Sequence, residues 1–257
     1  MKRFMFAFGA VLVTAALASA QPPAVQQPPA RGTGGGSGQP AQPPPPPKNL
    51  QVLPKDMPRD QLLATMGAFT QALGVNCNYC HVQDRAADDL RTKAAARQML
   101  ILARDINQKL PQAVNKTADQ ATRVGCVTCH RGVPIPKQLS DILLDTEQEK
   151  GADAAVAQYW DLRKQFYGRA AYDFGDGTLI AVAQRLTNDK PDDALKFLEI
   201  NTQFFPGSSR TFQAMSAAHM KKNDKADAIK DLEKAAAADP QNAQLKRQLD
   251  QLKGASQ

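Results

Sequence analysis

The sequence has few of the residues that most often hold metals or act as nucleophiles. Its 257 residues include three histidines and four cysteines. All four cysteines lie in two copies of one pattern, Cys77-Asn78-Tyr79-Cys80-His81 and Cys126-Val127-Thr128-Cys129-His130. The sequence also lacks zinc-finger spacing and any block of Lys and Arg with interleaved aromatic residues. We therefore expect no nucleic-acid partner, although the formal net charge is +7.

Each copy of the pattern matches the signal for covalent attachment of c-type haem. Two thiols separated by two residues fit the two vinyl groups of a porphyrin, and the next histidine can reach the iron as an axial ligand. A lone Cys-x-x-Cys also occurs in thioredoxin-like redox sites and zinc sites, but neither needs a histidine directly after the second cysteine. The sequence predicts two c-type haems, attached at Cys77, Cys80, Cys126 and Cys129 and ligated by His81 and His130.

The first twenty residues have the pattern of a secretory signal. Lys2 and Arg3 precede an apolar run from Met5 to Leu17, and Ala18-Ser19-Ala20 is a small-residue cleavage site. The apolar run is short for a membrane span of about 20 residues. We expect export to a bacterial periplasm, with membrane association if the signal stays uncleaved.

Composition divides the rest of the chain into four parts. Residues 21–48 are rich in Pro and Gly and poor in large apolar residues, as in a disordered linker. Residues 49–137 hold both haem motifs, residues 138–177 form a helical connector, and residues 178–257 form a repeat with a capping helix. The predicted fold class is all-α, with a small dihaem c-type cytochrome domain followed by a short tetratricopeptide-like helical array.

Two helices are expected in the haem domain besides a short one at each motif. The first begins near Pro58 and stops at Gly74, with Leu62, Met66, Phe69 and Leu73 on one face. The second spans residues 92–110 and is ended by Pro111; it carries Met99 on a face shared with Leu102, Ile106 and Leu110. We expect Pro134 and Pro136 to end the short helix of the second motif.

Residues 178–245 contain a repeat of 34 residues, the tetratricopeptide period. A shift of 34 aligns Ala183 with Ala217 and Ala194 with Ala228, where small residues allow close helix packing. Residues 241–253 read as a capping helix. Residues 154–167 should add one more helix, anchored by burial of Trp160 and Phe166. Such an array commonly takes a peptide or protein on its concave face.

The motifs themselves do not identify the sixth ligand of either iron, which must come from elsewhere in the chain. His219 is the remaining histidine, and its place among alanines of the repeat is typical of a helix-surface residue. Outside the signal and the repeat, the methionines are Met57, Met66 and Met99. Core packing on apolar helix faces would also explain Met66 and Met99.

Several runs of residues resemble the cytochrome c subunit of photosynthetic reaction centres, and together they are similar to one dihaem half of that tetrahaem subunit. The resemblance implies that Met66 ligates the haem on Cys77 and Cys80, and that Met99 ligates the haem on Cys126 and Cys129. The second dihaem half is missing, and Ala113 stands where the family has a histidine for a further haem. The similar runs are Asn49-Leu50-Gln51-Val52-Leu53-Pro54, Thr65-Met66, Asn78-Tyr79-Cys80-His81, Arg97-Gln98-Met99-Leu100, Arg104-Asp105-Ile106-Asn107 and Val127-Thr128-Cys129-His130-Arg131-Gly132.

Histidine on one side and thioether on the other leave iron six-coordinate, and thioether ligation favours Fe(II). We therefore predict an electron carrier rather than an enzyme, exchanging single electrons with a redox partner or a membrane-bound complex. Arg97 and Arg104 share a helix face that could pair with haem propionates or be a solvated basic surface. Two alternatives remain: a peroxidase-like dihaem enzyme with an open iron, and a cytochrome whose tail acts mainly as a docking module.

Overall fold

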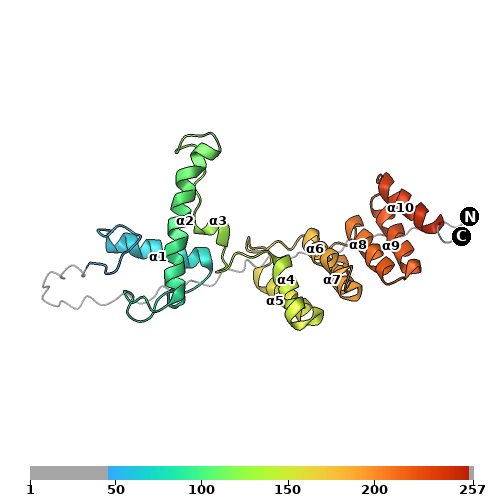
Figure 1. The fold of residues 1–257 in the computed structure, drawn as a ribbon, viewed down its shortest axis with the longest axis horizontal. Helices are drawn as coiled ribbons and strands as arrows, with labels where there is room; N and C mark the ends of the chain where they lie inside the picture. The colour runs from blue at the N-terminus through green and yellow to red at the C-terminus, as the bar shows by residue number, and fades with distance from the viewer. Residues whose placement is uncertain (1–45, 255–257) are drawn as a thin grey trace, which may run out of the picture. The chain divides into compact units, whose positions relative to one another are not determined.

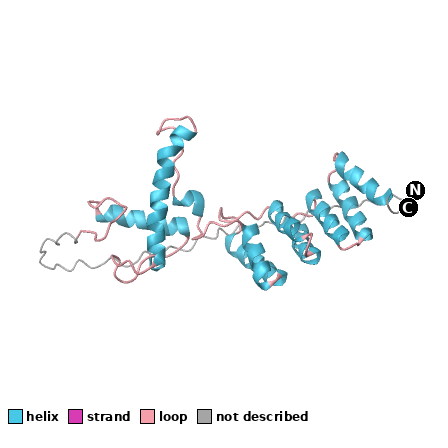
Figure 2. Ribbon diagram, in the orientation of Figure 1, coloured by secondary structure: helices cyan, strands magenta, loops and turns pink. Residues whose placement is uncertain are grey.

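The computed structural model describes residues 46–254, and within that range the chain is all helix and loop without a strand (Figure 2). Ten α-helices and one 3-10 helix account for the regular structure of these described residues. The predicted all-α class is therefore confirmed. The predicted signal, residues 1–20, and all but the last three residues of the predicted linker, residues 21–48, lie outside the described residues.

The haem region contains α1 (Arg59–Leu73), η1 (Cys77–Tyr79), α2 (Arg91–Ala113) and α3 (Cys126–His130), and Figure 1 labels its three α-helices. Helix α1 begins directly after Pro58 and ends at Gly74, as predicted. Gly74 has φ +65°, the left-handed conformation in which glycine commonly ends a helix. Both attachment motifs open a short helix, which is 3-10 at the first motif and α at the second.

Two predicted helix ends are wrong. Pro111 does not stop α2 but lies inside its last turn, and the helix continues to Ala113. Pro111 has no N–H to donate to the carbonyl four residues back, but the Leu110 and Pro111 carbonyls accept from the N–H groups of Val114 at 3.0 Å and Lys116 at 2.9 Å, so the turn that contains Pro111 is still closed by hydrogen bonds. Helix α3 ends at His130, before Pro134 and Pro136, because Arg131 and Gly132 turn the backbone to φ +48° and +90°.

The C-terminal helical array contains α4 (Leu139–Lys150), α5 (Ala152–Phe166), α6 (Asp176–Leu186), α7 (Pro191–Phe204), α8 (Ser209–Lys221), α9 (Lys225–Ala238) and α10 (Ala243–Gly254). Helices adjacent in sequence pack against one another, α4 with α5, α6 with α7, α7 with α8, α8 with α9, and α9 with α10 (Figure 1). One hydrophobic core joins α4 to α8, and a smaller one joins α9 to α10. The helices within 138–177 thus share a core with the repeat segment.

The array agrees with the 34-residue alignment at one pair of helices and departs from it at another. Ala194 of α7 and Ala228 of α9 are both fully buried, as aligned small residues should be. In α8, however, Ala217 is exposed and Ala218 is the buried alanine. Helix α8 begins one residue earlier than the 34-residue shift from the start of α6 predicts. The tail is helical, and its assignment as tetratricopeptide stays a prediction.

The extra helix expected at residues 154–167 is α5, and of its two predicted anchors Phe166 packs half-buried against the array core, whereas the prediction for Trp160 is wrong. Trp160 is 40% exposed, whereas Tyr159 is 1% exposed and meets the rings of Trp160 and Phe174 edge-on. The inward face of α5 runs through Ala152, Ala155 and Tyr159, which follow helical spacing, so Trp160 falls at the edge. Between residues 46 and 254, no helix is both long and apolar enough to span a bilayer.

Candidate haem-attachment site

The first motif is a tight turn that presents its residues from one short segment. The side-chain oxygen of Asn76 accepts a hydrogen bond from the Asn78 N–H at 3.0 Å and so caps the 3-10 helix. The N–H groups of Cys80 and His81 both donate to the Cys77 carbonyl, at 3.4 and 3.1 Å. Neither thiol is in a disulfide. Both cysteines and the histidine are therefore held on a single turn of backbone.

The second motif is held against α1. The Thr128 hydroxyl accepts a hydrogen bond from the Gly125 N–H at 3.0 Å, which caps α3 at its start. At its other end, the Gly132 N–H donates to the Ala72 carbonyl of α1 at 2.8 Å. A Cβ on Gly74 would lie 2.1 Å from the Gly132 carbonyl oxygen, so α1 meets this loop backbone to backbone. Residues far apart in sequence thus bring the second motif beside the end of α1.

The two motif histidines share one arrangement. Nδ1 of His81 lies 3.1 Å from the Arg85 carbonyl oxygen, and Nδ1 of His130 lies 3.0 Å from the Val133 carbonyl oxygen. A carbonyl only accepts, so Nδ1 carries the proton and donates in both cases. Metal-ligating histidines characteristically donate their second ring N–H in this way. Both imidazoles therefore keep Nε2 as the nitrogen with a free lone pair.

Helix α2 links the two motifs. Near its start, the Thr92 hydroxyl donates to the Tyr79 carbonyl of the first motif. Near its end, the Asn107 side chain donates to the Val124 carbonyl at 2.8 Å and accepts from the Val124 N–H at 2.7 Å, two residues before Cys126. These anchor points are roughly 22 Å apart along the helix axis at 1.5 Å per residue. Sequence reasoning gave Thr92 and Asn107 no role, although Asn107 stands in a run that carries the resemblance.

An ion-pair cluster holds the segment between the first motif and α2. Asp88 accepts from Arg97 at 2.8 Å, from Lys93 at 3.0 Å and from the side chains of Asn49 and Gln51 at 3.0 and 3.1 Å. Hydrogen bonds from Arg97, Asn49 and Lys93 hold the pKa of Asp88 well below its usual range. Arg97, a candidate for a propionate, is thus bound to Asp88.

Burial shifts the pKa values of two side chains in the first motif, Cys80 and His81. It raises the pKa of the Cys80 thiol, against a smaller opposing effect of a hydrogen bond with Thr92. It also lowers the pKa of His81, and the positive charge of Lys93 acts in the same direction. Both environments favour the neutral side chain, and the neutral imidazole is the form that binds metals.

The candidate methionines lie on different kinds of surface. Met66 is half-buried on α1, the helix that runs into the first motif and packs on the second. Met99 is 49% exposed on α2, in one apolar stripe with Leu102 and Ile106, which are 50% and 36% exposed. Exposed apolar stripes of this kind usually face a ligand or a partner. The assignment of either methionine to an iron stays a prediction.

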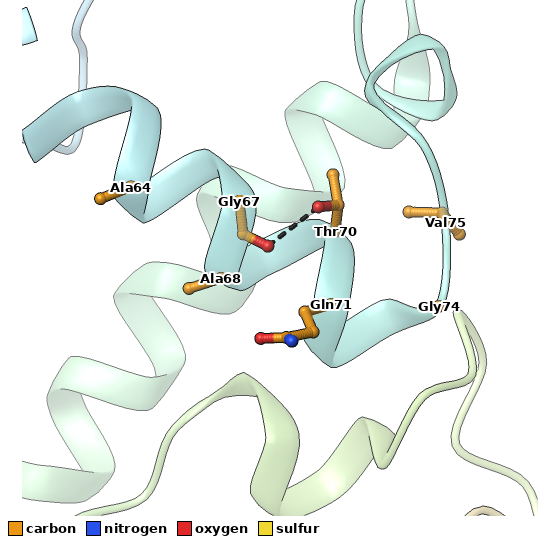
Figure 3. A pocket seen from close by; sticks show the side chains of 7 residues that line it. All are labelled: Ala64, Gly67, Ala68, Thr70, Gln71, Gly74 and Val75. Atoms are coloured by element: carbon orange, nitrogen blue, oxygen red, sulfur yellow. Dashed lines mark hydrogen bonds between the residues drawn. The ribbon is translucent and has the colours of Figure 1, made fainter. Parts of the chain in front are cut away.

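A hollow of about 760 Å³ runs along α1 beside Ala64, Gly67, Ala68 and Gln71 (Figure 3). The Thr70 hydroxyl at its edge donates to the Gly67 carbonyl at 2.9 Å. At 100° per residue, Ala64, Ala68 and Gln71 lie on the side of α1 away from Met66, whereas Thr70, four residues after Met66, lies on the same side as Met66. The hollow is therefore centred away from Met66, and its Thr70 edge reaches the face that carries the candidate ligand.

His219 is not the surface residue that its sequence context suggested. Its Nδ1 lies 2.8 Å from a carboxylate oxygen of Asp231, and the two side chains are 16% and 5% exposed. The pair ties α8 to α9 in the array. The described part of the chain contains no cluster of three or more His, Cys, Asp or Glu side chains placed to hold a metal ion.

Paired free thiols, each pair followed by a histidine whose Nδ1 donates to a backbone carbonyl, fit covalent haem, and these motifs are those of a c-type cytochrome. Residues 18–168, more than half of the chain, match the model of the photosynthetic reaction centre cytochrome c subunit, and the chain belongs to that family. The match continues beyond residue 137, the predicted end of the haem domain, through α4 and α5.

Curated relatives carry the same resemblance over shorter stretches. The photosynthetic reaction center cytochrome c subunit of Thermochromatium tepidum is 41% identical over 93 residues, 35% of this chain and 22% of that protein. Cytochrome c-554 of Chloroflexus aurantiacus is 41% identical over 88 residues, 34% of this chain and 20% of that protein. The chain thus spans about a fifth of the length of these relatives. No solved structure matches it.

Proposed function

We propose that this protein is an exported dihaem c-type cytochrome that carries single electrons. The observation that carries the proposal is the duplicated site: two attachment motifs, each with paired thiols and a histidine whose Nδ1 donates to a backbone carbonyl. Covalently held haem iron would supply the one-electron Fe(III)/Fe(II) couple.

The chain's own residues have separate tasks in this proposal. Cys77, Cys80, Cys126 and Cys129 hold the macrocycles through thioether bonds, and His81 and His130 each offer Nε2 to an iron. The Arg85 and Val133 carbonyls fix the orientation of the two imidazole rings. Thr92 and Asn107 fasten both motifs to α2 and so limit their relative movement while the charge changes.

The apolar faces of α1 and α2 carry the two methionines whose thioether sulfurs we propose as ligands of the irons. The exposed stripe of Met99, Leu102 and Ile106 could cover a macrocycle face and exclude water from it. In the proposal, Met66 and Met99 close the sixth positions, as the resemblance implies. Two closed irons leave no place for a substrate, which distinguishes a carrier from an enzyme.

Haem count is the first test of this proposal. The exported protein should give a pyridine haemochrome spectrum of two c-type haems per chain. The matched variants Cys77→Ala/Cys80→Ala and Cys126→Ala/Cys129→Ala should each retain one. A count of zero or one in the wild type would contradict the proposal directly.

Carbon monoxide then tests whether the irons are closed. The reduced wild-type spectrum should not change with the gas, whereas Met66→Ala and Met99→Ala should each open one iron to it. Met57→Ala is the matched control, because Met57 precedes α1 and should leave both irons closed. A wild-type spectrum that shifts with carbon monoxide would favour the peroxidase-like alternative.

A membrane-associated redox complex is the partner that we propose. The relative from Thermochromatium tepidum is named as a subunit of a photosynthetic reaction center. The experiment is to follow haem absorbance in two mixtures with membranes of the source bacterium. The oxidised protein is mixed with membranes under reducing conditions, and the reduced protein with membranes under oxidising conditions. Electron exchange faster than with vesicles of lipid alone supports the proposal, and equal rates oppose it.

The array offers a place for docking. An open groove of about 780 Å³ lies between α6, α8 and α10, with Ala217 and Met220 exposed in its wall and Gln184, Gln213 and Gln248 along it. We propose that a peptide segment of the redox partner binds here. Ala217→Arg should slow electron exchange with membranes and leave the haem spectrum unchanged. An unaltered rate would oppose a docking role for the groove.

A further inference from the structure

The loop after the first attachment motif folds around a buried ammonium group. Lys93 of α2 is 9% exposed, and its Nζ donates to the carbonyl oxygens of Ala87 at 2.6 Å, Ala86 at 3.1 Å and Arg85 at 3.2 Å. The same nitrogen lies 3.0 Å from a carboxylate oxygen of Asp88. Lysine is almost never buried unless its charge is paired. Here both the charge and the N–H donors are satisfied by this one loop.

One of these carbonyls also belongs to the haem site. The Arg85 oxygen accepts from Lys93 and from Nδ1 of His81. The corresponding carbonyl of the second motif, that of Val133, accepts from His130 and, in the described structure, from no lysine or arginine side chain. The two otherwise similar histidines therefore differ in the cation that is hydrogen-bonded to their carbonyl partner.

This difference acts on the iron in a definite direction. An Nδ1–H donated to a carbonyl makes the imidazole a stronger base and favours Fe(III). A cation on the same oxygen competes for its lone pairs and weakens that donation. The positive charge of Lys93 also disfavours the more positive iron. Asp88 offsets part of this charge, but its side chain is 45% exposed and that of Lys93 only 11%, so solvent screens the carboxylate more strongly.

We infer that Lys93 is a positioning residue that raises the reduction potential of the haem on Cys77 and Cys80 and has little effect on the second haem. The inference rests on the proposed function, since it requires His81 to ligate an iron. The two haems then differ in reduction potential because of one residue of the chain, and the charge of Lys93 makes the first haem easier to reduce.

The test is a potentiometric titration of the full-length holoprotein, followed by haem absorbance. Lys93→Gln keeps a hydrogen-bond donor and removes the charge, so one of the two midpoint potentials should fall. We expect a change on the order of tenfold in the Fe(II)/Fe(III) ratio, which is 59 mV for a one-electron couple. Asp88→Asn should move the same potential upward. The second potential should stay in place in both variants.

The matched control is Lys109→Gln, which removes the same charge from an exposed position on α2. Equal shifts in Lys93→Gln and Lys109→Gln would overturn the inference and leave only a net-charge effect. Shifts of the same sign in Lys93→Gln and Asp88→Asn would also overturn it, because structural damage has no reason to depend on the sign of the charge removed.

Lys93→Arg keeps the charge and should keep the potential close to that of the wild type, even if Lys93→Gln loosens the loop. A low potential in Lys93→Arg with an intact spectrum would contradict the role of the charge. A wild-type protein without two haems would instead refute the proposed function, so the two failures are distinguishable.

Discussion

The haem region and the helical array differ strongly in how many apolar side chains they bury. In the array, Leu143, Ala155, Phe197 and Leu198 are completely buried, within one core that runs from α4 to α8. Among residues 46–137, the buried apolar side chains are Ala72 and Val133, and the third buried residue is Lys93. Apolar burial contributes about 25 cal/mol per Å². The array can therefore stabilise itself in a way that the haem region cannot.

The haem region is held by single polar contacts at named points. Thr92 bonds to Tyr79, Asn107 to Val124, and Gly132 to Ala72, each fixing one end of a helix to a motif. A typical internal hydrogen bond contributes only about 0.5–1.5 kcal/mol. Under the proposed function, apolar contacts with covalent haem would add to these hydrogen bonds. Breaking either region should thus affect the other very little.

The largest effect should come from removing haem attachment altogether. In the full chain with all four cysteines replaced by Ser, we expect residues 59–137 to lose protection from amide hydrogen exchange, because little apolar surface remains to hold them. Residues 139–245 should stay protected. The comparison would fail if the haem region kept wild-type protection without haem.

Phe197→Ala should have the next largest effect, confined to the array. Phe197 is 0% exposed, and such a truncation costs about 3–5 kcal/mol of unfolding free energy through lost burial and a cavity. Urea unfolding followed by circular dichroism measures it, while the haem spectrum should not change. Leu63→Ala is the contrasting variant, because Leu63 is 60% exposed on α1. A loss of the haem spectrum in Phe197→Ala would show that the regions depend on each other.

Sequence alone predicted what depends on local signals. The all-helical class, the start of α1 after Pro58 and its end at Gly74 followed from periodicity and helix-ending residues. Predicted ends at Pro111 and Pro134 were wrong, because α2 continues past Pro111 with one backbone hydrogen bond missing and because Arg131 and Gly132 end α3 first.

Contacts across the chain could not be read in that way. A lysine in a helical stretch looks like a solvated charge, and only the fold shows that Lys93 is surrounded by the loop after the first motif. In the same way, Tyr159 rather than Trp160 anchors α5, because the direction of packing decides which neighbour faces inward. The four cysteines and two histidines of the motifs were evident from spacing, but the residues that orient them were not.

Gly74→Ala should weaken the junction between α1 and the second motif. The new Cβ would lie 2.1 Å from the Gly132 carbonyl oxygen, at a backbone φ of +65°. We expect a loss of about 1–3 kcal/mol in the stability of the haem region. Gly67→Ala is the matched control on the same helix: its Cβ meets nothing within 4 Å, and Ala is the better helix former. Equal effects in the two variants would show that the junction contributes nothing.

The smallest expected effect is a loss of stability at low pH that is specific to the haem region. Because its partners lower the pKa of Asp88 below the ordinary value of about 3.9, the unfolded chain binds a proton more readily than the folded one. The stabilisation is therefore complete above about pH 4 and declines as the pH falls below it. Asp88 is exposed, so solvent and salt screen the effect and keep it small.

Comparison with Asp88→Asn isolates this contribution. Urea unfolding of the holoprotein, followed by haem absorbance, should show the variant less stable than the wild type at pH 6. The two should converge at lower pH, since protonation removes from the wild type the charge that the variant already lacks. Amide hydrogen exchange of residues 139–245 should report no such convergence, because the hydrogen bonds and ion pairs of Asp88 are to residues of the haem region. A difference between variant and wild type that stayed constant with pH would mean that Asp88 acts through the shape of its hydrogen bonds and not through its charge.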